Sequence, residues 1–182
     1  MARYDITPEQ GNPWDREPGG SSSHAEDHQP MRLYLVQHGQ AFPAAEHPDR
    51  PLTDPGRREV ATVAARLARS QPPISRIVHS GKTRARQTAE ILADHLTPGQ
   101  PVEAAAGLDP HDPVEPWVTA ANGWTEDRLL VGHQPFLGQL VSRLVLGEDH
   151  ALVDYRPGTV VCLEPTGAGG WRIVGMFGPA LL

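Results

Sequence analysis

Two histidines that follow apolar runs are the residues of this sequence best suited to chemistry. The run LYLVQHG, residues 33–39, ends on Gln37, His38 and Gly39, and the run LLVGH, residues 129–133, ends on His133. Such runs are typical of buried strands, and ligands of open α/β sheets bind outside the carboxyl ends of the strands. Gly39 permits a sharp backbone turn and the close approach of a bulky ligand group. The pattern therefore predicts that both imidazoles face one pocket.

A third polar cluster is the basic segment SGKTRARQT, residues 80–88. It places Lys82, Arg84 and Arg86 at the start of an expected helix, where cations oppose the helix dipole. A local rule broken in this way often marks a functional site, although a solvated basic turn is the alternative. Helix N-termini and arginines both attract phosphate, so an anionic ligand would resolve the conflict. With two histidines nearby, the segment favours phosphoryl transfer, in which a neutral imidazole attacks phosphorus and arginine neutralises the equatorial oxygens.

Motifs of other chemistries are missing from the sequence. There is no H-E-x-x-H, no paired C-x-x-C and no dense carboxylate cluster, so neither a metal nor another cofactor is expected. The glycine run TGAGG, residues 166–170, lacks the lysine of a P-loop, and no G-x-S-x-G elbow indicates a serine hydrolase. The net charge of −6 and the lack of a basic block argue against nucleic-acid binding.

The elements that position these clusters alternate between strand and helix. Strands are expected over residues 32–36, 74–80 and 128–132, and helices from the Thr53–Pro55 cap to about residue 70, over 83–96 and over 135–146. Residues 97–127 resemble a loop with a short helix around Trp117, and strands 159–163 and 171–177 flank a TGAGG hairpin turn. This order predicts an α/β fold with three layers, α/β/α, and a mostly parallel central sheet whose final strands can pair antiparallel.

Composition divides the chain into a tail and one domain. Residues 1–30 are rich in Pro, Gly, Ser and charge, which predicts a disordered N-terminal tail, and residues 31–182 form the expected domain. No apolar run approaches the roughly 20 residues that span a bilayer, and the N-terminus lacks the order of a secretory signal. The single cysteine, Cys162, excludes an intrachain disulfide. We therefore expect a cytoplasmic protein without membrane association.

Four segments together resemble the histidine phosphatase superfamily, also called phosphoglycerate mutase-like, and within it the short SixA-type phosphohistidine phosphatases. They are LYLVQHG, RPLTDPG from Arg50, SGKTRARQTAEIL from Ser80 and LLVGHQPFLGQLVSRL from Leu129, in the family's order. The resemblance implies that His38 is the nucleophile that forms a phosphohistidine intermediate and that Arg84 binds the phosphoryl group. It also implies that His133 stabilises the transition state, and it places Gln37 and Gly39 in the phosphate-binding set.

The sequence departs from the family pattern at Gln37, where an arginine is usual. A charged hydrogen bond contributes ~1.5–3 kcal/mol against ~0.5–1.5 kcal/mol for a neutral one. The exchange could therefore slow the reaction by roughly an order of magnitude. Arg50 would lie at the pocket wall, and Asp109, Asp112 and Glu115 are candidates for a general acid.

These residues predict a metal-independent phosphatase that acts through His38, with protein phosphohistidine as the expected substrate. The partner would accordingly be a phosphorylated protein or a small phosphate ester, with no nucleic acid and no membrane. The alternatives are a phosphatase or mutase for small phosphate esters, and a weakly active phosphate- or phosphoprotein-binding module in which Gln37 has removed the chemistry. A purely structural α/β domain would require all four segments to match by coincidence.

Overall fold

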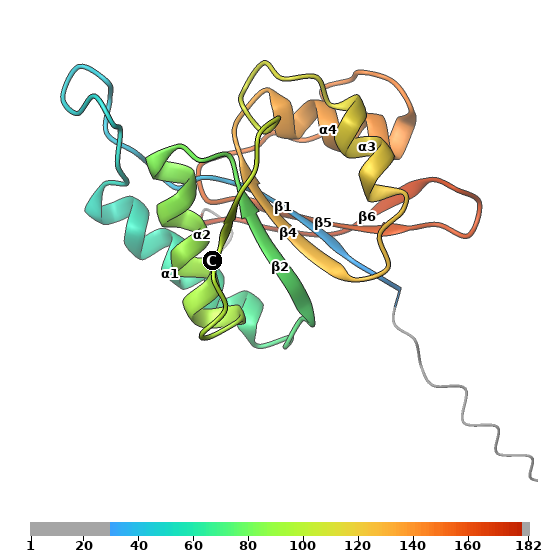
Figure 1. Ribbon diagram of the computed structural model, residues 1–182, viewed down its shortest axis with the longest axis horizontal. Coiled ribbons are helices and arrows are strands. Elements are labelled where there is room, and N and C mark those ends of the chain that lie inside the picture. Colours follow the sequence, from blue (N-terminus) through green and yellow to red (C-terminus); the bar gives the residue numbers. More distant parts are fainter. Residues whose placement is uncertain (1–29, 180–182) are drawn as a thin grey trace, which may run out of the picture.

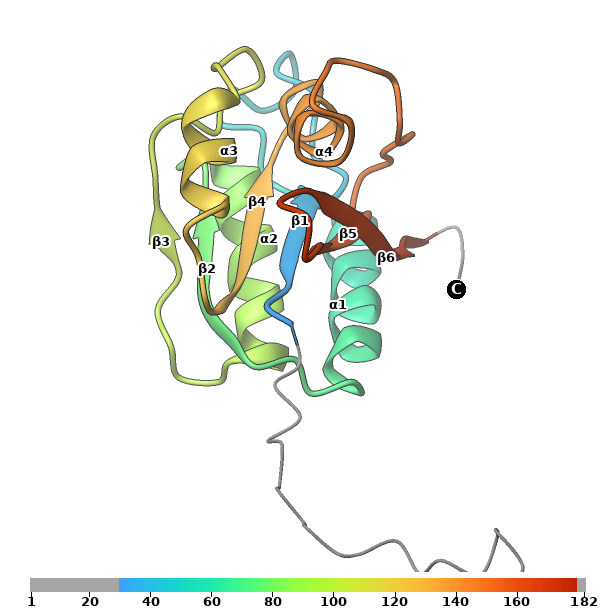
Figure 2. The ribbon, with the colours of Figure 1, turned by 90° about the vertical axis from the view of Figure 1, so that its right-hand side faces the viewer.

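A computed structural model of the chain describes residues 30–179, so the tail expected over residues 1–30 lies outside this range except for its last residue. Six strands form one sheet in the order β3-β2-β4-β1-β5-β6 (Figures 1 and 2). Their bounds are β1 (Leu33–Gln37), β2 (Ile74–His79), β3 (Glu103–Ala104), β4 (Asp127–Gly132), β5 (Val160–Pro165) and β6 (Trp171–Phe177). β3, β2, β4 and β1 run parallel, whereas β5 pairs antiparallel with both β1 and β6. The expected α/β fold with a mostly parallel sheet and antiparallel final strands is confirmed.

Helices cover both faces of the sheet and make it the middle of three layers (Figures 1 and 2). α1 (Asp54–Ala68) and α2 (Thr83–Leu96) lie on one face, and α3 (Glu115–Ala121) and α4 (Phe136–Leu146) lie on the other. A hydrophobic core lies on each face of the sheet, and alternate residues of β1 contribute to each. Tyr34 and Val36 pack with α1 and α2, whereas Leu33 and Leu35 pack on the side of α3 and α4. Because β1 is buried on both faces, its sequence is a continuous apolar run rather than an alternation of apolar and polar residues.

Helix α1 begins where the cap residues predict. Thr53 is its N-cap, the hydroxyl oxygen of Thr53 accepts from the amide of Gly56 at 3.1 Å, and Pro55 lies in the first turn. The apolar stripe that includes Val60 and Leu67 is buried against the sheet. The helix ends at Ala68, two residues before the expected end near residue 70.

The stretch between residues 97 and 127 holds one element that periodicity did not predict. β3 is only two residues long and pairs with the end of β2, so it leaves no repeating pattern in the sequence. The short helix expected around Trp117 is present as α3, and the Trp117 indole donates to the carbonyl of Gly107 at 2.7 Å. No helix within residues 30–179 combines the length and the apolar character needed to cross a membrane.

Candidate active site

The register of the sheet brings the polar clusters to one edge. Gln37 of β1 is opposite Gly132 of β4, and His79 of β2 is opposite Val131 of β4. The residues that follow, His38 and His133, therefore lie together at the carboxyl ends of neighbouring parallel strands. The centroids of the two imidazole rings are 5.0 Å apart, and the ring planes are tilted by 59°. The two rings thus lie side by side, and the expectation that one pocket receives both of them stays a prediction.

The His38 ring is fixed by contacts on both nitrogens. Nδ1 lies 2.7 Å from the carbonyl oxygen of Gly39, which accepts hydrogen bonds only, so Nδ1 carries the hydrogen. Nε2 then holds a lone pair, which accepts from Nε of Arg84 at 3.1 Å. Burial is the main cause that lowers the pKa of His38 to about 4; the hydrogen bond to the Gly39 carbonyl opposes it, and the charges of Arg84 and Arg50 lower the pKa further. The ring is therefore neutral near pH 7 and presents Nε2 as a nucleophilic lone pair.

His133 is more deeply buried than His38, with a relative exposure of 2%. Burial lowers the pKa of His133 to about 3, and His38, Arg84 and Lys82 add to the effect, whereas Asp109 opposes it. Nε2 of His133 lies 2.7 Å from the hydroxyl oxygen of Ser80. Nδ1 of His133 is buried and has no hydrogen-bond partner within the described part of the chain. One nitrogen of this neutral ring is therefore held by Ser80, and the other has no partner in residues 30–179.

The three cations of the basic segment have different surroundings. Lys82 Nζ lies 2.9 Å from a carboxylate oxygen of Asp109, and Arg86 pairs with Glu90 at 3.1 Å on the exposed side of α2. Arg84 is only 9% exposed and makes no ion pair with a carboxylate among residues 30–179. Burial, with a contribution from the charge of Arg50, lowers the pKa of Arg84 from its usual high value. Arg84 is thus the buried cation that contacts a histidine.

Backbone hydrogen bonds hold Gln37 and Gly39 at the carboxyl end of β1. The amide of Gln37 donates to the carbonyl of Thr159 at 3.0 Å, while its side-chain oxygen Oε1 is buried without a partner among the described residues. The amide of Gly39 donates to the Thr88 hydroxyl oxygen at 3.0 Å. A Cβ on Gly39 would lie 2.6 Å from Cγ2 of Val60 in α1. A Cβ at this position would therefore overlap α1, and the expectation that a ligand group approaches Gly39 stays a prediction.

The remaining predicted residues differ in their relation to this cluster. Arg50 has a left-handed backbone with a φ of 48°, and its Nε donates to the carbonyl of Phe42 at 3.2 Å. Its charge lowers the pKa of His38, as described above. Asp109 is held by Lys82, and a carboxylate oxygen of Asp112 accepts from the amide of Asp109 at 2.8 Å. Glu115, the third candidate acid, pairs with Arg143 at 2.8 Å.

Three further residues support the cluster and were not predicted from the sequence as site residues. Ser80 contacts His133, as described above. The Thr88 hydroxyl donates to the carbonyl of Arg84 at 2.8 Å while it accepts from Gly39, and the Gln87 side chain accepts from the amide of Leu52 at 2.8 Å. All three lie in the segment SGKTRARQT. In the sequence, the only indication of their role is that these polar residues lie at the start of a helix with an apolar face.

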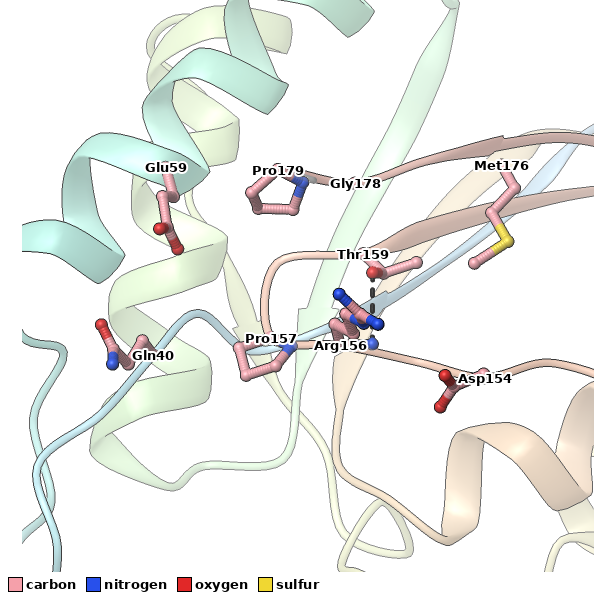
Figure 3. Close-up of a pocket in the computed structure, with 9 residues that line it drawn as sticks. All are labelled: Gln40, Glu59, Asp154, Arg156, Pro157, Thr159, Met176, Gly178 and Pro179. Carbon is pink, nitrogen blue, oxygen red and sulfur yellow. Dashed lines mark hydrogen bonds between the residues drawn. The ribbon is translucent and has the colours of Figure 1, made fainter. Parts of the chain in front are cut away.

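A cavity of about 630 Å³ lies beside the strand edge (Figure 3). Neither histidine of the cluster lines it, and Arg84 does not line it either. The lining residues come from α1, β6 and the loops around them: Gln40, Glu59, Asp154, Arg156, Pro157, Thr159, Met176, Gly178 and Pro179. The loop that forms one wall is tied to the cluster because the amide of Gly158 lies 3.1 Å from the carbonyl of Gln37 and 3.2 Å from that of His38. No group of three or more His, Cys, Asp or Glu side chains in residues 30–179 is arranged to hold a metal ion.

Known proteins share both the sequence segments and the fold. Residues 33–112 match the profile of the Histidine phosphatase superfamily (branch 1). The phosphohistidine phosphatase SixA of Escherichia coli K12 is 30% identical over 150 residues, which cover 79% of this chain and 93% of SixA. The human mitochondrial serine/threonine-protein phosphatase PGAM5 is 32% identical over 102 residues, or 52% of this chain and 35% of PGAM5.

The solved structures agree with these sequence relationships. The structure of the protein histidine phosphatase SixA complexed with tungstate superposes with a TM-score of 0.74 and 25% identity, and the match covers 83% of this chain and 99% of SixA. The similarity to SixA therefore extends over nearly all of that protein, in sequence and in fold. The chain belongs to the histidine phosphatase superfamily and is a phosphatase of this type.

Proposed function

We propose that this chain is a protein phosphohistidine phosphatase in which His38 is the nucleophile. The observation that carries the proposal is the neutral imidazole of His38, whose Nδ1 hydrogen is bound to Gly39 and whose Nε2 lone pair faces Arg84. An imidazole fixed in this form needs no general base to become a nucleophile. The similarity to SixA over 93% of the length of that protein supports the same substrate class.

The reaction proceeds in two displacements at phosphorus. Nε2 of His38 attacks the phosphoryl group, the bond between phosphorus and the leaving nitrogen breaks, and the leaving imidazole takes a proton from solvent. Arg84 neutralises charge on the equatorial oxygens, and His133 donates a hydrogen bond to one of them. Water then attacks phosphorus, the bond to Nε2 breaks, and inorganic phosphate leaves with the lone pair of His38 restored.

The surroundings of the carboxylates favour phosphohistidine over a phosphate monoester. An alkoxide leaving group needs a proton from a general acid, whereas imidazole is a better leaving group and makes less demand for one. Asp109 is bound to Lys82, Asp112 accepts from a backbone amide, and Glu115 is bound to Arg143. Each carboxylate thus has an oxygen engaged by a basic side chain or a backbone amide. We infer that none of the three is a strong general acid.

A phosphorylated protein in the cytoplasm is accordingly the partner that we propose. The buried single cysteine, Cys162, fits a location in which thiols stay reduced. A small phosphate ester is the second candidate substrate. The variant Asp109→Asn distinguishes the two candidate substrates. Hydrolysis of an alkyl phosphate requires a general acid, whereas hydrolysis of p-nitrophenyl phosphate requires one far less. A large loss on an alkyl phosphate alone would favour the monoesterase.

The decisive experiment is intact-mass analysis after brief mixing with phosphoramidate and quenching in alkali, which preserves phosphohistidine. We expect one added phosphoryl group on the parent protein and none on His38→Ala. A phosphohistidine-containing peptide should then be dephosphorylated with a higher kcat/KM than alkyl phosphates. A parent protein that binds vanadate yet never forms the adduct would refute covalent catalysis at His38.

A further inference from the structure

The contact between Ser80 and His133 joins two strand ends that are adjacent in the sheet. Ser80 follows β2 directly, and its hydroxyl oxygen lies 2.7 Å from Nε2 of His133, which follows β4. His133 is 2% exposed, so water does not compete for this nitrogen. Ser80 itself is half-buried. The pair is the only side-chain hydrogen bond that His133 makes within the described residues.

We propose that Ser80 is a positioning residue that donates its hydroxyl hydrogen to Nε2 of His133 and so holds that ring in its Nδ1–H form. The inference rests on the proposed function, because it concerns how His133 meets the transferred phosphoryl group. A neutral imidazole carries one N–H, and the hydrogen bond made by one nitrogen decides which nitrogen bears it.

The free nitrogen of His133 explains why this form matters. Nδ1 is buried and has no partner in residues 30–179, so it is the nitrogen available to an incoming group. A phosphoryl oxygen accepts hydrogen bonds and is bound by an N–H, whereas a nitrogen lone pair repels it. If Nε2 carried the hydrogen and donated to Ser80, Nδ1 would present a lone pair to the anion. Only a donating Ser80 leaves Nδ1–H for the phosphoryl group.

A second serine of β2 provides a matched control. The Ser75 hydroxyl donates to the backbone carbonyl of Asp127 at 2.9 Å, and it too links β2 to β4. Ser75 is half-buried like Ser80 but lies at the opposite end of the strand. Ser75→Ala therefore removes a cross-strand hydroxyl contact of the same kind without touching a histidine. A purely structural role for Ser80 would give the two alanine variants similar behaviour.

The test combines histidine NMR with vanadate binding. The protein is labelled with ¹⁵N-histidine, and the His133 ring signals are assigned by their loss in His133→Asn. We expect the Nδ1–H pattern for His133 in the parent protein and in its vanadate complex. Ser80→Ala should shift His133 toward the Nε2–H form and weaken vanadate binding by roughly three- to tenfold, the value of one hydrogen bond. Ser80→Thr should restore both readouts, and Ser75→Ala should change neither.

Three results would overturn the inference. They are an Nε2–H pattern for His133 in the parent vanadate complex, unchanged ring signals in Ser80→Ala, and equal losses of vanadate affinity in Ser80→Ala and Ser75→Ala. Failure of the proposed function looks different. In that case the parent protein forms no phosphoryl adduct in the mass experiment, while the NMR signals of His133 still depend on Ser80.

Discussion

Nε of Arg84 and Nε2 of His38 face each other at 3.1 Å, so the buried cation lies directly against the nitrogen lone pair. A cation in this position opposes protonation of His38 and attracts an incoming phosphoryl group. His38→Ala should therefore abolish both the phosphoryl adduct and turnover while the circular dichroism spectrum and the unfolding midpoint stay close to those of the parent. Turnover at the parental rate would show that another residue is the nucleophile.

Arg84 should contribute to anion binding far more than its neighbour in the helix. A charged hydrogen bond contributes ~1.5–3 kcal/mol, so Arg84→Ala should weaken vanadate binding by roughly 10- to 150-fold. The control is Arg86→Ala, which removes a guanidinium that pairs with Glu90 on the exposed side of α2. We expect the control to bind vanadate like the parent. Equal losses in both variants would mean that general positive charge, rather than the buried position of Arg84, attracts the anion.

Gln37→Arg should tighten vanadate binding. The buried Oε1 of Gln37, which has no partner among residues 30–179, marks a polar position at the end of β1, and a guanidinium there adds charge-assisted donors. We expect roughly tenfold tighter binding by titration calorimetry, from the difference between charged and neutral hydrogen bonds. Gln139→Arg adds the same charge on an exposed residue of α4 and should have no effect. An unchanged affinity in Gln37→Arg would place the side chain of residue 37 outside the anion site.

Stability should fall as the pH drops below about 6.5. The pKa values of His38 and His133 are lowered to about 4 and about 3 in the folded protein, whereas in the unfolded chain both lie near 6.5. Between these values the unfolded state binds more protons, so the free energy of unfolding decreases with falling pH. Each histidine contributes at most ~1.4 kcal/mol per pH unit. Urea unfolding at pH 7.5, 5.5 and 4.5 measures the slope, and the double variant His38→Gln/His133→Asn should be clearly less steep than the parent.

Gly56 should tolerate no side chain. A Cβ at Gly56 would overlap the carbonyl oxygen of Gln40 and lie 2.9 Å from the amide nitrogen of Gln40. Backbone atoms cannot swing aside, so Gly56→Ala should lower the free energy of unfolding by about 1–3 kcal/mol. Gly167→Ala is the control, because nothing lies within 4 Å of a Cβ there. If both variants unfold at the same urea concentration, the contact between α1 and Gln40 is not as close as described.

Much of the architecture could be predicted because it follows from local patterns. The bounds of α2 and β6 match the expected ranges 83–96 and 171–177, since apolar spacing and glycine turns determine them. The meeting of His38 and His133 followed from the rule that parallel strands end at one edge. β3 was missed because two residues carry no periodicity.

The finer contacts of the site could not be read from the sequence because they depend on tertiary packing. The pairing of Lys82 with Asp109 joins a helix start to a loop 27 residues later, and no local pattern specifies it. Gly39 was singled out for the approach of a ligand group, whereas the contact that the structure shows in its Cβ direction is with Val60 of α1. The segment SGKTRARQT was likewise recognised for its charges, whereas its hydroxyls make the contacts to Gly39 and His133.

The double contact of Thr88 has a mechanical consequence. One hydroxyl accepts from the amide that follows His38 and donates to the carbonyl of Arg84, so the nucleophile and its cation share a single anchor. A displacement of α2 relative to the sheet therefore has to stretch or break the bond between Thr88 and the Gly39 amide as it moves Arg84 away from His38. The distance that sets the electrostatic field at Nε2 is thus limited by one hydrogen bond between helix and strand.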